Sequence, residues 1–115
     1  MYERVKNKLL PNMILIRDFS KNFSIDEDID FIYIDGNHKY KYVLEDLTKW
    51  YNKLKTGGII VADDAVDIDD DKRDENGDVV IKWNDNCSGK YGVIKAFKDF
   101  GKPFSKIGNQ ILLIK

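Results

Sequence analysis

The sequence predicts an α/β fold built on a parallel sheet, and a strand–helix–strand pattern carries this prediction. The apolar runs over Phe31–Ile34 and Gly58–Ala62 have the length and composition of buried strands. Between them, from about 39 to 54, apolar residues recur at helical spacing along one stripe: Tyr40, Val43, Leu44, Leu47, Trp50, Tyr51 and Leu54. A strand, a helix and a second strand in this order form the unit that joins parallel strands by a crossover.

The elements around this unit are shorter. Residues 2–10 predict a short basic helix that stops near Pro11, and residues 13–16 predict a brief strand. The strand before the long helix is expected to begin at Ile29. Gly57 and Gly58 are expected to end the long helix, because glycine adopts the left-handed conformation without steric cost.

The second half of the chain begins with an abrupt change of composition. Nine acidic residues lie between Asp63 and Asp78, which predicts a long, solvated and partly mobile loop or insertion at about 65–89. Its alternating aspartates resemble a calcium loop, but Lys72 occupies the position where such a loop needs glycine. A second amphipathic helix is expected over Tyr91–Phe100, followed by a hairpin that turns at Gly108 and Asn109.

The bulk composition limits the function classes. The 115 residues support one domain, and 19 basic residues nearly cancel 20 acidic ones, so we expect neither nucleic acid nor a membrane surface as a partner. The single cysteine, Cys87, excludes an internal disulfide and fits a reducing compartment. No stretch approaches the ~20 apolar residues of a membrane span, and the first residues lack the apolar core of a signal peptide. A cytoplasmic location is therefore expected.

Three carboxylates and an imidazole follow the two central strands. Asp35 comes directly after the first strand and the pair Asp63-Asp64 after the second. Because ligands gather at the carboxyl ends of strands in open α/β sheets, these side chains are expected at one crevice, where they suit a hard divalent cation. The alternative interpretation has Asp35 as a helix cap and the acidic pair as part of a solvated loop. The residue pattern alone leaves both open.

His38 is the only histidine, and it lies three residues after Asp35. The unperturbed pKa of histidine, near ~6.5, allows it to accept a proton at neutral pH. At the start of the long helix and beside the expected cation, it is a candidate general base. A surface or helix-capping histidine is the alternative.

Two segments resemble a known enzyme family. The run Asp30-Phe-Ile-Tyr-Ile-Asp-Gly-Asn-His-Lys-Tyr40, continued through Asp46-Leu-Thr-Lys-Trp50, and the run Leu54-Lys-Thr-Gly-Gly-Ile-Ile-Val-Ala-Asp-Asp64 resemble class I S-adenosylmethionine-dependent methyltransferases. They are most similar to the branch that holds metal-dependent sugar and macrolide O-methyltransferases and cephalosporin-hydroxylase-like proteins. The resemblance covers most of the chain from about Met13, and Gly92–Phe97 resembles the helix after the family's variable loop.

The resemblance implies a Rossmann-like sheet and a role for individual residues. Asp35, Asp63 and Asp64 become candidate Mg²⁺ ligands, and His38 becomes the candidate base for a hydroxyl on a small molecule or sugar. The implied cofactor is S-adenosylmethionine, and Asp18 is the candidate acid that contacts it. The reaction implied is O-methyl transfer.

One part of the family pattern is missing. The chain has no Gly-rich turn of the G-x-G-x-G kind and no following strand that ends in a ribose-binding acid. By analogy with the family's strand order 3-2-1-4-5-7-6, the sheet is expected to be truncated by two strands between Met13–Ile16 and Ile29–Ile34. Met13–Ile16 then pairs directly with the next strand, or self-association or a missing N-terminal half fills the gap, or the chain is a fragment.

Two functions therefore stay in view. The first is a methyltransferase-like protein that carries the acceptor side of the site and is incomplete as this chain. The second is a non-catalytic binding or assembly module that keeps the fold without turnover.

Overall fold

The structure is a computed structural model that describes residues 28–115, in which two helices lie on one face of a four-stranded sheet. The expected helix over 2–10 and the expected strand over 13–16 lie outside the described residues. The elements in chain order are β1 (Ile29–Ile34), α2 (Tyr40–Tyr51), β2 (Leu54–Ala62), the 3-10 helix η1 (Asp70–Lys72), β3 (Val79–Asn84), β4 (Cys87–Tyr91), α3 (Val93–Phe100), β5 (Ser105–Ile107) and β6 (Gln110–Ile114).

The main sheet is mixed, with the strand order β1-β2-β6-β5. β1 and β2 are parallel, with Ile34 opposite Ala62, so the predicted strand–helix–strand unit is confirmed. β6 runs antiparallel to β2 and places Ile111 opposite Ala62. Within the described sheet β1 is an edge strand, and the two additional strands implied by the family order are not among these residues.

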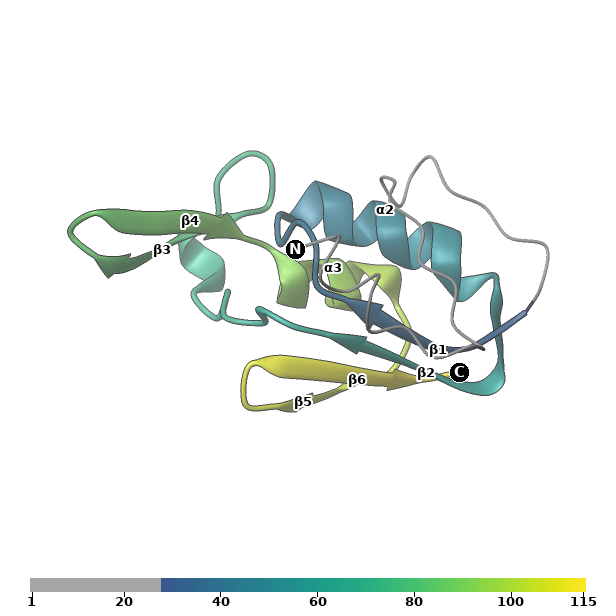
Figure 1. The fold of residues 1–115 in the computed structure, drawn as a ribbon. Coiled ribbons are helices and arrows are strands. Elements are labelled where there is room, and N and C mark those ends of the chain that lie inside the picture. Colours follow the sequence, from purple (N-terminus) through teal and green to yellow (C-terminus); the bar gives the residue numbers. More distant parts are fainter. Residues whose placement is uncertain (1–27) are drawn as a thin grey trace.

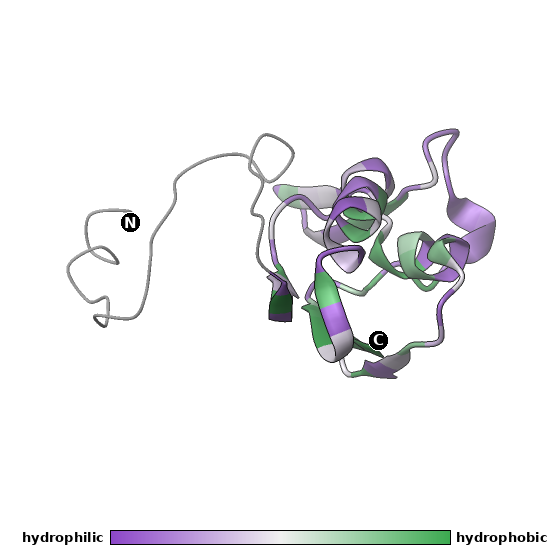
Figure 2. Cartoon of the chain, turned by 90° about the vertical axis from the view of Figure 1, so that its right-hand side faces the viewer, coloured by the Kyte–Doolittle hydropathy of each residue, from purple (hydrophilic) through white to green (hydrophobic). Residues whose placement is uncertain are grey.

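The core lies between the sheet and the two helices. Both helices cover the same face, as the end-on view of Figure 2 shows. The central side chains are fully buried and come from every layer: Leu47 of α2, Ile60 of β2, Phe97 of α3 and Ile111 and Leu113 of β6. On the opposite face of the sheet Phe31 and Ile114 are 56% and 63% exposed.

The long helix is shorter than its apolar stripe predicts. α2 ends at Tyr51, and Leu54 is instead the first residue of β2, where it pairs with Ile29. The expected role of Gly57 and Gly58 as the helix stop is therefore wrong: both lie inside β2, where Gly57 has a φ of 85°. The end of α2 is instead held by a residue that is distant in sequence. The Lys115 ammonium donates to the carbonyl oxygens of Tyr51 and Leu54 at 2.9 and 2.8 Å.

The acidic stretch is not a bare loop. It contains η1 and a separate antiparallel hairpin, β3–β4, which projects from the body of the molecule in Figure 1. Cys87 is exposed in the first position of β4, at the tip of this hairpin. The predicted second helix is confirmed over Val93–Phe100 as α3, although Tyr91 belongs to β4.

The last two strands agree with the expected hairpin. β5 and β6 pair antiparallel with Ile107 opposite Gln110, and Gly108 in the turn has a φ of 59°. Gly101 ends α3 with a φ of 85°, the left-handed conformation that glycine favours. Over residues 28–115 no helix is long and apolar enough to span a membrane.

Candidate acceptor site at the strand ends

The carboxyl ends of β1 and β2 meet, as the sequence predicts. The backbone N–H of Asp63 donates to the carbonyl oxygen of Ile34 at 3.1 Å, which places Asp63 beside the residue that follows Ile34, Asp35. The residues that line the resulting narrow crevice include all four candidate site residues at this edge: Ile34, Asp35, Gly36, Asn37, His38, Val43, Asp63, Asp64 and Val93. The predicted juxtaposition is thus confirmed.

Asp35 does not cap the helix that follows it. The first N–H of α2, on Tyr40, donates to a carboxylate oxygen of Asp78 at 2.7 Å, and Asn37 accepts from the N–H of Lys39 at 2.9 Å. The helix start is therefore capped by a residue 38 positions away in sequence. The capping alternative for Asp35 is wrong, because another carboxylate already occupies that role.

The carboxylates lie close enough to influence one another's ionisation. Burial raises the pKa of Asp64, and the negative charges of Asp63 and Asp35 raise it further, while nearby His38 lowers it. Partial burial likewise raises the pKa of Tyr33, followed by the charges of Asp63 and Asp35. Asp64 also adopts a positive φ of 62°. The crevice is therefore an electronegative site held by a turn of unusual backbone conformation.

This arrangement gives no support for the expected magnesium site. Among residues 28–115 no group of three His, Cys, Asp or Glu side chains is placed to hold a metal ion. Both carboxylate oxygens of Asp63 are already engaged within the chain, one by the N–H of Asp64 at 2.9 Å and the other by the hydroxyl of Tyr33 at 3.4 Å. The three carboxylates line one crevice, but the described part of the chain does not bring them together as a three-ligand cation set.

The position of His38 fixes which of its ring nitrogens carries the proton. Its Nδ1 lies 2.7 Å from the carbonyl oxygen of Lys90. Because a carbonyl oxygen can only accept a hydrogen bond, Nδ1 must donate, and in the neutral ring Nε2 then holds the lone pair. The half-buried imidazole also stacks on the Tyr91 ring, with centroids 3.9 Å apart and planes at 14°. His38 is thus a positioned imidazole with one nitrogen available to accept a proton.

The partners of His38 come from the hairpin that the sequence predicts only as an acidic insertion. Tyr91 is buried at the end of β4, and its hydroxyl accepts a hydrogen bond from the indole N–H of Trp83 at 3.2 Å. The Trp83 and Tyr91 rings meet edge to face, with centroids 6.0 Å apart. Sequence reasoning missed both residues as part of the site, because Tyr91 fits the start of the following helix equally well and only the hairpin pairing brings it to His38.

The acidic segment before the hairpin is pinned to the fold. Asp67 is fully buried, accepts from the N–H groups of Ile94 and Lys95 at the start of α3, and lies 3.0 Å from Arg73 in a buried ion pair. Asp74 accepts from the N–H of Asp78 at 3.0 Å. Much of the segment is exposed, as expected for a solvated loop, but these two carboxylates accept hydrogen bonds from N–H groups at a helix start and in a turn.

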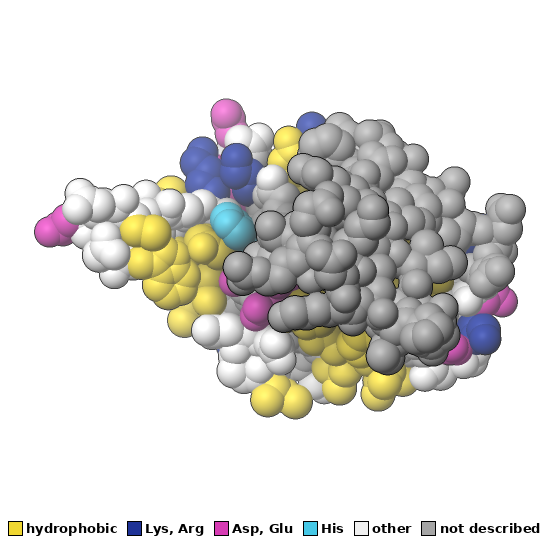
Figure 3. Space-filling view, viewed as in Figure 1, with side chains coloured by type: hydrophobic (Ala, Val, Ile, Leu, Met, Phe, Trp, Pro, Cys, Tyr) yellow, Lys and Arg dark blue, Asp and Glu magenta, His cyan; other side chains and the backbone are white. Residues whose placement is uncertain are grey.

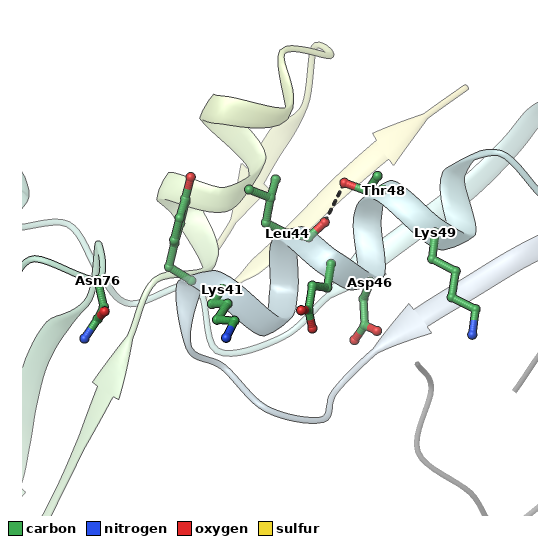
Figure 4. Close-up of a pocket in the computed structure, with 8 residues that line it drawn as sticks. Lys41, Leu44, Asp46, Thr48, Lys49 and Asn76 are labelled. Atoms are coloured by element: carbon green, nitrogen blue, oxygen red, sulfur yellow. Dashed lines mark hydrogen bonds between the residues drawn. The ribbon is translucent and has the colours of Figure 1, made fainter. Parts of the chain in front are cut away.

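A larger hollow lies elsewhere, along α2. Its volume is about 650 Å³, and Figure 4 shows the side chains that line it: Tyr40, Lys41, Leu44, Glu45, Asp46, Thr48, Lys49 and Asn76. It shares no lining residue with the crevice at the strand ends and contains no histidine or cysteine. The ionisable constellation, not the larger hollow, is therefore the candidate site.

Asp18, the candidate cofactor-binding residue, lies outside the described residues. The structure consequently brings together His38, Asp35, Asp63 and Asp64 and leaves the donor side of the site without an assigned residue.

The comparisons with known proteins identify a family for the chain. A family model described as a methyltransferase domain matches residues 6–65, more than half of the chain, and its range includes β1, α2, β2 and all of the candidate site residues. The β3–β4 hairpin lies beyond the matched range. No curated protein and no solved structure matches the chain. By this match, the chain belongs to the methyltransferase-domain family.

Proposed function

We propose that this chain supplies the acceptor side of an S-adenosylmethionine-dependent O-methyl transfer, with His38 as the general base. The observation that carries the proposal is the contact between His38 Nδ1 and the Lys90 carbonyl oxygen, at 2.7 Å. It leaves Nε2 as the proton acceptor at a strand-end crevice in a family of methyltransferases. Membership of that family implies S-adenosylmethionine as methyl donor in general.

The chemistry asks little of the protein beyond positioning and proton removal. The bound donor supplies a methyl group on a positively charged sulfur. With the donor bound, a hydroxyl oxygen of the acceptor would form a bond to the methyl carbon as the carbon–sulfur bond breaks, and Nε2 of His38 would take the hydroxyl proton. The stacked Tyr91 ring and the Lys90 carbonyl hold the imidazole in one orientation, which reduces the loss of rotational freedom in this step.

The acidic pair has an electrostatic role in this scheme. Asp64 lies near enough to His38 for their charges to interact. When His38 takes the proton, the carboxylates of the crevice stabilise the resulting imidazolium.

The acceptor is a small molecule or sugar that presents a hydroxyl group. The crevice itself is too narrow to take up an acceptor, so the acceptor is proposed to dock at its mouth with the reacting hydroxyl at Nε2 of His38. The donor side is proposed to be incomplete in this chain, since the sequence holds no Gly-rich turn for the cofactor.

A labelled-methyl assay tests the proposal. The purified chain is incubated with S-adenosylmethionine carrying a radiolabelled methyl group, at a high donor concentration, and a panel of sugar and small-molecule alcohols. His38→Gln keeps a polar side chain of similar length but removes the base, and we expect it to reduce transfer by about a hundredfold or more. Lys39→Gln, at the adjacent exposed position, should leave transfer unchanged.

Two results would overturn the proposal. Equal transfer by His38→Gln and the parent chain would remove His38 as the base. Absence of transfer to every alcohol in the panel would favour the non-catalytic binding module instead.

Calorimetry tests the proposed incompleteness of the donor side separately. We expect S-adenosylmethionine to bind the purified chain with millimolar or weaker affinity. Micromolar binding would show that the chain carries a working donor site.

A further inference from the structure

The hairpin beside His38 holds a tryptophan in an unusual setting. Trp83 is 53% exposed, although tryptophan carries the largest apolar surface of any side chain. On the hairpin Lys82 pairs with Ser88 and Asn84 with Cys87, so Trp83 is the extra residue of a β-bulge. Bulges redirect side chains and are frequent next to functional sites. The local backbone therefore aims this indole rather than leaving it in the ordinary alternation of the strand.

The indole is also held in place. Its only polar atom, Nε1, donates to the Tyr91 hydroxyl at 3.2 Å, and the two rings meet nearly at right angles, at 84°. Tyr91 is in turn stacked on His38. Two ring contacts in series thus connect the candidate base to an exposed aromatic surface whose hydrogen-bonding need is already met.

A glycine two positions before Tyr91 on β4 makes the arrangement sterically feasible. A Cβ placed on Gly89 would lie 3.0 Å from Cε1 of Tyr91, closer than ordinary van der Waals contact. The absence of a side chain at Gly89 therefore lets the Tyr91 ring lie over the strand and reach both His38 and Trp83. Figure 3 shows hydrophobic side chains of the hairpin gathered next to the histidine on one face of the molecule.

We infer that Trp83, supported by Tyr91, is a binding subsite for the flat apolar face of a ring in the acceptor. The indole would stack on the ring while a hydroxyl of the same molecule reaches Nε2 of His38. This inference rests on the proposed function, because it takes His38 as the position of the reacting hydroxyl. Both a pyranose and an aromatic ring present such a face, and the experiment distinguishes them.

The test is an NMR titration of the purified chain that needs no turnover. The probes are methyl β-D-glucopyranoside and phenol, with glycerol as an alcohol that has no ring. His38 is the only histidine, and a Trp50→Phe background leaves Trp83 as the only tryptophan. The indole N–H and the imidazole C–H resonances therefore report directly on the two ends of the subsite.

We expect at least one ring alcohol, and not glycerol, to shift both resonances in one saturable process. The probe that does so identifies the kind of ring. Trp83→Ala should weaken binding about fivefold or more, measured by the shift of His38, and Trp83→Phe should retain most of the affinity. Val80→Ala is the matched control, because Val80 is a similarly exposed hydrophobic residue of the same strand, at 59%. It should leave the affinity unchanged.

Three results would overturn the inference. The first is that neither ring alcohol shifts the resonances, and the second is that Trp83→Ala does not weaken the binding seen at His38. The third is that S-adenosylhomocysteine shifts the Trp83 resonance instead, which would assign the indole to the methyl donor.

The proposed function fails in a different way. If ring alcohols bind through Trp83 but His38→Gln transfers methyl groups normally, the subsite stands and the base assignment falls. If transfer needs His38 but Trp83→Ala leaves the KM for the ring alcohol unchanged, the base assignment stands and the Trp83 subsite falls.

Discussion

The carboxylate of Asp67 accepts a hydrogen bond from the backbone N–H of Ile94 at 2.9 Å, across 27 positions of sequence. This contact ties the segment after β2 to the start of α3, and Arg73 balances its charge at 3.0 Å. The acidic segment is consequently anchored to the fold at Asp67, and it leads into the hairpin that carries Tyr91 and Trp83.

Replacing Asp67 should destabilise the fold strongly. Asp67→Ala leaves two helix N–H groups without their acceptor in a buried position and removes one of the two carboxylates that pair with Arg73. We expect this to cost about 3 kcal/mol. Urea unfolding followed by circular dichroism measures the change. Asp71→Ala, an exposed aspartate of η1, is the control and should stay within about 0.5 kcal/mol of the parent chain. Equal effects of the two substitutions would contradict the buried-cap assignment.

Gly92 should not tolerate even a methyl group. A Cβ at this position would lie 2.4 Å from Cβ of Tyr40 and 2.7 Å from a carboxylate oxygen of Asp78. Gly92→Ala must therefore displace the start of α2 or its capping carboxylate, at a cost of about 1–3 kcal/mol. Gly36→Ala is the matched control, since nothing lies within 4 Å of its added Cβ. Thermal unfolding of both variants measures the difference, and an unchanged melting temperature for Gly92→Ala would refute the steric argument.

Replacing Asp64 by asparagine should favour the folded state more at neutral pH than at acid pH. Burial and the charges of Asp63 and Asp35 raise its pKa in the fold above the reference value of 3.8. The fold therefore disfavours the ionised form of Asp64, so the carboxylate charge destabilises the fold at pH 7 but not at pH 3. Asp64→Asn removes this charge and still accepts the positive φ.

We expect Asp64→Asn to gain stability relative to the parent chain as the pH rises from 3 to 7, by about half a kcal/mol at the upper end. Denaturant titrations at several pH values measure the gain. Asp85→Asn at the fully exposed hairpin tip should show no such trend. A gain that does not depend on pH would point to a cause other than charge.

Acid should weaken the segment around the hairpin base. The N–H of Asp78 lowers the pKa of Asp74, with further contributions from Asn76 and Lys90. A lowered pKa in the fold gives stabilisation that is complete well above the unfolded value of 3.8 and is lost as the pH falls through the folded value. The melting temperature should therefore fall between pH 6 and pH 3, and Asp74→Asn should fall less over the same range. Identical pH profiles would exclude Asp74 as a contributor.

Much of the central unit was predictable from the sequence because its signals are local. The apolar runs of β1 and β2 and the stripe of α2 specify a strand, a helix and a parallel strand. Parallel pairing then dictates that Asp35 and Asp63 meet at one edge. The meeting of these carboxylates at the strand ends follows from these two facts alone.

The rest depended on contacts between distant residues. The end of α2 is set by Lys115, the cap of α2 by Asp78 and the cap of α3 by Asp67. None of these partners is near its helix in sequence, so a local pattern of charge in the acidic segment resembles a solvated loop. Tyr91 and Trp83 escaped notice for the same reason, since their relation to His38 exists only once β3 and β4 pair.

The position of Cys87 gives the molecule a built-in reporter. It is the only thiol in the chain and is exposed at the hairpin tip, a short distance along the strands from Trp83. A maleimide-linked dye at this sulfur would be attached without mutagenesis and would exchange energy with the nearby indole. Changes in this energy transfer would record movement of the hairpin tip relative to Trp83 when a small molecule binds.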